Sequence, residues 1–204
     1  LRINRHSTIW NSPRMNLFIR FSLTMALALF MSACTQIITA TTDKPIADDP
    51  GSRSLGSYVD DEIIETKVLV NINKTDPALK ASRISATSHN AIVLLTGNTA
   101  SEDLRQLAGE IASGVKKVRK VHNELSVGAD VSMLARSNDA WISTKVKSRL
   151  SLNEQLDASK IKVVTENGIV YLMGLVSKAE SDTAATVVSE TSGVQKVVRV
   201  FEYY

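Results

Sequence analysis

Cys34 is the only cysteine among the 204 residues, and the residues before it suit covalent attachment of lipid. An apolar run ends at Phe30 and Met31, two small residues follow, and the cysteine comes next. This order is typical of a bacterial lipoprotein signal, in which the leader is cleaved and the cysteine takes lipid chains such as palmitate. An acylated Cys34 leaves no thiol for a disulfide, a metal site or a nucleophile.

The three histidines do not form a reactive cluster. His6 lies in the leader, His89 falls at a predicted turn and His122 within or next to a predicted strand, without clustered carboxylates beside them. We expect His89 to be a solvated turn residue and His122 a surface residue. Phosphate-binding glycine loops and nucleophile elbows are also absent from the sequence. The sequence therefore predicts a non-enzyme with no cofactor and no metal.

A tryptophan and several cations share one predicted helix in the last third of the chain. At 100° per residue, Trp141 points away from the apolar stripe of that helix. An indole at the headgroup boundary, with cations beside it that meet lipid phosphates, is typical of an interfacial membrane contact. The predicted phospholipid-binding residues are Asn138, Trp141, Thr144, Lys145, Ser148, Arg149 and Leu152, with Lys147 as an accessory cation. The alternative is that Trp141 packs against the other half of the chain or the linker between the halves.

The predicted leader occupies residues 1–33, and its true start is expected at Met15. From there, Arg20 precedes an apolar core at 21–31, eleven residues long. A membrane-spanning helix needs about 20 apolar residues, which disfavours the alternative of a transmembrane anchor. Thr35 follows the cysteine in place of the aspartate that retains such lipoproteins in the inner membrane of enteric-type bacteria. This likeness implies transfer to the outer membrane, with the protein in the periplasm.

Removing the leader changes the charge balance. It holds four of the 24 basic residues and none of the 21 acidic ones, so the rest of the chain has 20 basic and 21 acidic residues and a net charge of −1. The general attraction to nucleic acid that a basic chain shows is therefore not expected.

The rest of the chain divides into a linker and an internal repeat. Residues 34–58 contain the lipidated cysteine and a segment rich in Thr, Ser, Asp and Gly, predicted to be a flexible tether. The predicted domains are 59–128 and 137–204. Matching segments are IETKV and ISTKV at 64 and 142, IVLLTG and IVYLMG at 92 and 169, and KVRKV and GVQKV at 117 and 193.

Each copy predicts the order α-β-β-α-β. The opening helices carry apolar stripes at i, i+4 and i+8, with Asp60 or Asp61 and Asn138 or Asp139 as expected N-caps. Turns at 89–90 and 167–168 join the first two strands, and Ser101 and Ser177 open the second helices. The strands are expected at 84–87, 92–97 and 118–127, and at 161–165, 169–174 and 194–203. This is an α+β fold with two helices on one face of a three-stranded mixed sheet.

Two such repeats, with V-x-L-x-G strands and G-V-x-x-V turns, resemble BON domains. The strongest stretches are 137–146 (SNDAWISTKV) and 165–176 (TENGIVYLMGLV). From Cys34 onward the chain resembles dual-BON outer-membrane lipoproteins. The resemblance implies binding of anionic phospholipid (phosphatidylglycerol and cardiolipin) by the second domain, a role in outer-membrane integrity, enrichment at division sites and contact with the barrel-assembly machinery.

The opening helices differ in charge, which indicates different roles for the two copies. The first carries Asp60, Asp61, Glu62 and Glu65 against Lys67, whereas the second is net positive. An alternative function is therefore a protein-interaction adaptor that uses the acidic helix or a sheet edge. A separate basic cluster either complements the end of a helix or forms an accessory contact with lipid or peptidoglycan; it comprises Lys116, Lys117, Arg119 and Lys120.

Overall fold

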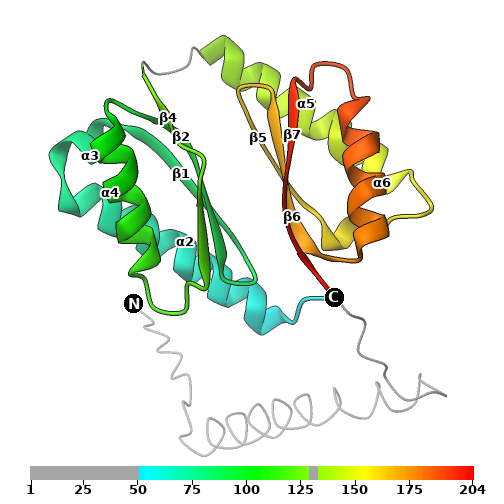
Figure 1. Cartoon of the computed structure of the whole chain (residues 1–204), viewed down its shortest axis with the longest axis horizontal. Coiled ribbons are helices and arrows are strands. Elements are labelled where there is room, and N and C mark those ends of the chain that lie inside the picture. The colour runs from blue at the N-terminus through cyan, green and yellow to red at the C-terminus, as the bar shows by residue number, and fades with distance from the viewer. Residues whose placement is uncertain (1–50, 129–132) are drawn as a thin grey trace, which may run out of the picture. The chain divides into compact units, whose positions relative to one another are not determined.

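The computed structural model describes residues 51–128 and 133–204. The predicted leader, Cys34 and most of the linker lie outside the described residues. The described residues belong to one compact unit. Within it, Figure 1 shows two sheets, each with helices covering one face.

The first domain begins with helix α2 (Leu55–Thr75) and the short helix α3 (Pro77–Ala81). Strands β1 (Arg83–His89) and β2 (Ile92–Thr99) form an antiparallel hairpin, and helix α4 (Glu102–Ser113) follows. The chain then returns parallel to β2 as β3 (Lys120–Asn123) and β4 (Ser126–Val127). The predicted last strand at 118–127 is thus divided into two short strands.

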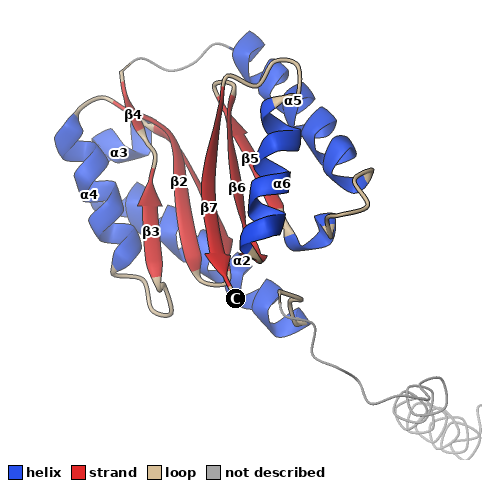
Figure 2. Cartoon of the chain, turned by 45° about the vertical axis from the view of Figure 1, so that its right-hand side comes forward, coloured by secondary structure: helices blue, strands red, loops and turns tan. Residues whose placement is uncertain are grey.

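The second domain repeats this order. Helix α5 (Met133–Ser151) and a 3₁₀ turn, η1 (Ala158–Lys160), precede β5 (Lys162–Glu166) and β6 (Ile169–Val176). After α6 (Lys178–Ser189), strand β7 (Lys196–Tyr203) pairs parallel to β6 at the edge of the sheet. Figure 2 shows the three strands with α5 and α6 beside them. The α+β class and the mixed sheets are confirmed.

Each domain has its own core between helices and sheet. The predicted stripes are buried: Ile64, Val68 and Ile72 in α2, and the matching residues of α5. They pack on alternate residues of the central strand of each sheet and on small residues of α4 and α6.

A third apolar cluster joins the opposite faces of the two sheets. Ile92 and Leu94 of β2 pack with Tyr171 and Met173 of β6 and with Val200 of β7. Side chains alternate along a strand, so Val93 and Leu95 face the helices while Ile92 and Leu94 face the other sheet. This explains why β2 is apolar on both faces.

Two predictions about where the opening helices begin are wrong. Helix α2 begins at Leu55 with Ser54 as its N-cap, so residues 55–58 of the predicted linker are helical. Asp61 lies inside α2, one and a half turns from its start, and Asp139 lies inside α5. Both carboxylates bind the hairpin turn that follows, as shown below. By contrast, Ser101 caps α4 and Ser177 forms a capping box with Glu180, as predicted.

Across the described ranges, none of the helices combines the length and apolar character needed to cross a membrane. The same ranges hold no cluster of three or more side chains of the kinds that bind metal ions.

Candidate functional site

Helix α5 presents Trp141 to solvent. Ile142, Val146 and Leu150 are fully buried, whereas Trp141 has 63% of its surface exposed. The prediction that the indole points away from its own core is confirmed. Among the described residues, Trp141 takes no part in the apolar contact between the two sheets, so its packing against the first domain is not found. The linker at 129–132, with which the indole was alternatively expected to pack, lies outside the described residues.

The loop between α6 and β7 forms the floor beside the indole. Lys145 Nζ donates a hydrogen bond to the backbone oxygen of Ser192, and Arg149 Nη1 donates to the backbone oxygen of Glu190 at 2.7 Å. Glu190 caps the C-terminus of α6, where a helix carries partial negative charge, so Arg149 is held there electrostatically. The two long side chains are therefore positioned at the rim of a site.

These residues enclose a shallow hollow of about 520 Å³. It brings together an indole, an ammonium, a guanidinium and four hydroxyls, and also the Glu190 carboxylate, which lies 3.4 Å from Arg149 Nη2. The residues that line it are Trp141, Thr144, Lys145, Ser148, Arg149, Glu190, Thr191 and Ser192. A guanidinium has five N–H donors, so Arg149 retains donors for an anion even while it binds Glu190.

The remaining predicted residues lie at the edges of this site. Asn138 is exposed in the second turn of α5, and Leu152 follows the last turn with 79% of its surface exposed. Lys147 is exposed and lines a separate hollow beside η1 and β5. The structure therefore gathers Trp141, Thr144, Lys145, Ser148 and Arg149, and leaves the other three outside the hollow.

The basic cluster after α4 is engaged with other elements. Lys117 Nζ bonds the Asp60 carboxylate of α2 at 2.8 Å, and Arg119 bonds Glu202 of β7 at 2.7 Å and the backbone oxygen of Asn90 at 3.2 Å. Lys116 and Lys120 are exposed. Within the described part of the chain, the side-chain hydrogen bonds of Lys117 and Arg119 go to Asp60, Asn90 and Glu202 and not to the last carbonyls of α4.

A family model of the BON domain matches residues 60–129 and 138–203, the two repeats described above. The chain belongs to the BON domain family.

Comparison with known proteins extends the similarity over most of this chain. The chain is 35% identical to the outer membrane lipoprotein DolP of Haemophilus influenzae. The alignment covers 90% of this chain and 95% of that protein. The chain is 37% identical to a 21 kDa hemolysin of Actinobacillus pleuropneumoniae, over 74% of this chain and 78% of that protein. It is 28% identical to osmotically-inducible protein Y of Escherichia coli, over 73% and 75%. These relatives support an outer-membrane lipoprotein of the BON family.

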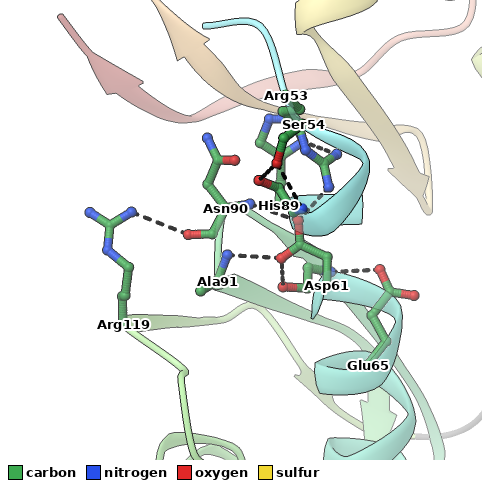
Figure 3. Close-up of polar contacts among 10 residues, drawn as sticks. Arg53, Ser54, Asp61, Glu65, His89, Asn90, Ala91 and Arg119 are labelled. Atoms are coloured by element: carbon green, nitrogen blue, oxygen red, sulfur yellow. Dashed lines mark hydrogen bonds and ion pairs between the residues drawn. The ribbon is translucent and has the colours of Figure 1, made fainter. Parts of the chain in front are cut away.

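A buried polar network in the first BON domain was missed by the sequence analysis (Figure 3). The Asp61 carboxylate accepts hydrogen bonds from the Ser88 hydroxyl at 2.6 Å and from the backbone N–H groups of Asn90 and Ala91 at 2.9 and 2.8 Å. It also forms an ion pair with Arg53. The carboxylate thus fixes the β1–β2 turn against α2, and Asp139 does the same with Asn167 and Gly168 in the second domain.

His89 belongs to this network, so the prediction that it is a solvated turn residue is wrong. Only 4% of its surface is exposed, and Arg53 Nη1 lies 3.1 Å from its Nδ1. Burial and, next, the charge of Arg53 lower the pKa of His89 from 6.5 to about 4. His122 is partly buried in β3, and burial lowers its pKa too.

The neutral His89 predicts a stability that depends on pH. Because its folded-state pKa lies below the unfolded value of 6.5, the unfolded chain binds more protons between pH 6.5 and about 4. His89 therefore lowers the free energy of unfolding as pH falls through this window, by up to about 3 kcal/mol. The raised pKa of Glu65, caused first by burial, acts in the opposite direction.

Urea unfolding of wild type and His89→Asn at several pH values isolates this contribution, because asparagine keeps an acceptor but does not titrate in this range. The difference in unfolding free energy between the two proteins is expected to change between pH 6.5 and 4 and to be constant above pH 7.5. An unchanged difference across the acidic window contradicts the assignment.

Proposed function

We propose that this protein is a periplasmic lipoprotein, anchored to the outer membrane through acylated Cys34, whose second BON domain binds anionic phospholipid. The observation that carries the proposal is an exposed Trp141 beside Lys145 and Arg149 on the rim of one hollow. Phosphatidylglycerol and cardiolipin are the expected ligands. We further propose, on the family resemblance, a role in outer-membrane integrity at division sites.

The geometry supports weak, reversible binding. A lysine or arginine near an anionic surface contributes about 1 kcal/mol, and an indole at the headgroup boundary adds burial of apolar area. Lys145 and Arg149 already bond backbone carbonyls, which holds them in place but shares their donors with the protein. A lipid anchor raises the local concentration of membrane, so a weak contact is sufficient.

Vesicle co-sedimentation of residues 35–204 tests this function. Without the lipid anchor, wild type is expected to sediment with phosphatidylglycerol vesicles and to stay in the supernatant with phosphatidylcholine vesicles. Trp141→Glu is expected to lose at least tenfold in affinity for the anionic vesicles, about 1.4 kcal/mol. Val127→Glu is the matched control, because it places the same charge at another exposed apolar residue. Equal binding by wild type and Trp141→Glu would falsify the site.

A second candidate is an adaptor for the barrel-assembly machinery. The observation that favours it is Glu62, which stays exposed on α2 beside apolar side chains. Photocrosslinking from position 62 in living cells is expected to capture an outer-membrane assembly protein if this function holds. Recovery of uncrosslinked monomer alone counts against it.

A further inference from the structure

Helix α2 carries an exposed apolar stripe that the first domain does not use. Val59, Ile63 and Val70 have 58%, 44% and 42% of their surfaces exposed, on the side of α2 opposite the buried stripe. Leu55 and Tyr58 extend the stripe toward the start of the helix. Ile63 and its neighbours line a hollow of about 430 Å³ that is almost entirely apolar.

This stripe occupies the same place in the fold as the Trp141 face. The buried stripes Ile64, Val68, Ile72 and Ile142, Val146, Leu150 set an offset of 78 residues between the two helices. Ile63 then corresponds to Trp141, Lys67 to Lys145 and Val70 to Ser148. The first domain therefore presents the apolar counterpart of a face that is cationic in the second.

The acidic residues of α2 do not make this face strongly anionic, because most are engaged inside the domain. Asp60 pairs with Lys117, Asp61 pairs with Arg53, and the Glu65 carboxylate accepts the backbone N–H of Ser88 at 2.7 Å. Of these acids, Glu62 alone lines the apolar hollow, together with Lys67 of opposite charge. The stripe is thus close to neutral, which suits a surface without a charge requirement.

The position of α2 in the chain favours a lipid bilayer as the partner of this exposed stripe. Only sixteen residues, 35–50, separate Cys34 from the first described residue, so they reach at most about 58 Å. Helix α2 is the first described helix after Cys34, so this reach limits its distance from a bilayer that holds the acylated cysteine. The stripe is bordered by the charged residues Glu62 and Lys67, and such a helix face can lie on a bilayer with its apolar residues in the headgroup–acyl boundary.

We propose that α2 is a second membrane-contact face, which inserts Val59, Ile63 and Val70 into lipid irrespective of headgroup charge. The inference rests on the proposed function for the lipid anchor but not for the α5 site. The two helices lie on the outer sides of sheets that pack together, so each exposed face meets a bilayer in its own orientation of the protein. In one orientation α5 recognises anionic headgroups, and in the other α2 makes an apolar contact that salt does not weaken.

Single-tryptophan fluorescence tests this face directly. Residues 35–204 contain Trp141 as their only tryptophan, so Trp141→Phe with Ile63→Trp places one reporter on α2. An N-terminal hexahistidine tag holds the protein on phosphatidylcholine vesicles that contain nickel-chelating lipid, in place of the Cys34 lipid chains. We expect a blue shift and loss of most of the emission when the lipid acyl chains are brominated, with no change in 0.5 M salt.

The matched control is Trp141→Phe with Val127→Trp, at an exposed apolar position on β4. Emission from position 127 is expected to be unaffected by brominated lipid. Quenching at position 63 that does not exceed quenching at position 127 overturns the proposal. A second sample with the native Trp141 on phosphatidylglycerol vesicles reads the α5 site separately, so failure of one face is distinguished from failure of the other.

Discussion

Replacing Asp61 with alanine is expected to lower the free energy of unfolding of the first BON domain by about 3–5 kcal/mol, because it removes one partner of a buried ion pair. The change leaves the Arg53 guanidinium buried without its carboxylate. It also removes the acceptor of the Ser88 hydroxyl and of two backbone N–H groups at the β1–β2 turn. A buried donor without a partner costs about 1–3 kcal/mol, so these losses reinforce one another.

Hydrogen exchange of backbone amides, read by mass spectrometry, measures this effect within the first domain. Protection of β1 and β2 is expected to fall in Asp61→Ala, whereas β5 and β6 keep most of their protection. Glu62→Ala is the matched control at the neighbouring exposed acid, with an expected change within about 0.5 kcal/mol.

Asp139→Ala provides an internal comparison, because Asp139 accepts the two equivalent backbone N–H groups at 2.8 Å each. Among the contacts of the described residues, Asp139 has no ion pair like that between Asp61 and Arg53. Replacement of Asp139 is therefore expected to cost less, about 1–3 kcal/mol. An Asp61→Ala effect no larger than that of Asp139→Ala contradicts the role assigned to Arg53.

Sequence patterns correctly predicted the features that depend on residues close together in the chain, namely helix faces, turns and helix caps. The i, i+4, i+8 stripes placed Ile64 and Ile142 in the cores, and the same periodicity placed Trp141 outside. The Asn167–Gly168 pair and the Ser177 capping box encode their conformations within a few residues. These features required no knowledge of the distant parts of the chain.

The missed features depend on contacts between residues distant in sequence. Asp61 has the residue type of an N-cap, but its role is set by a turn nearly thirty residues away. His89 is buried at a place shared by Arg53 of the predicted linker and by Ile161 and Lys162 of the second domain. The long apolar run of β2 was read as a strand, while the second sheet that covers its other face was not predicted. An apolar pattern indicates that a side chain is buried, but it does not show which distant residues of the chain cover it.

Gly97→Ala is expected to destabilise the first domain by at least about 3 kcal/mol, because two independent costs combine. The backbone at Gly97 has φ +116°, a conformation that residues with a Cβ rarely adopt. A Cβ there would also overlap the backbone oxygen of Arg83 on the neighbouring strand, which pairing with β1 holds in place. Gly174, the matching glycine of the second V-x-L-x-G strand, has φ +153° and would overlap the backbone oxygen of Lys160.

Gly128→Ala separates the two costs. Gly128 has φ +143°, but a Cβ there meets nothing within 4 Å among the described residues, so its replacement costs only the conformational part, about 1–3 kcal/mol. Thermal unfolding followed by circular dichroism is expected to rank Gly97→Ala and Gly174→Ala well below Gly128→Ala in melting temperature. Equal melting temperatures for all three variants would show that the neighbouring strand yields to the added methyl group. Melting temperatures that are clearly lower for Gly97→Ala and Gly174→Ala would mean that each of these glycines is required by the close approach of the adjacent strand. The positive φ alone does not explain such a difference, because Gly128 has a positive φ as well.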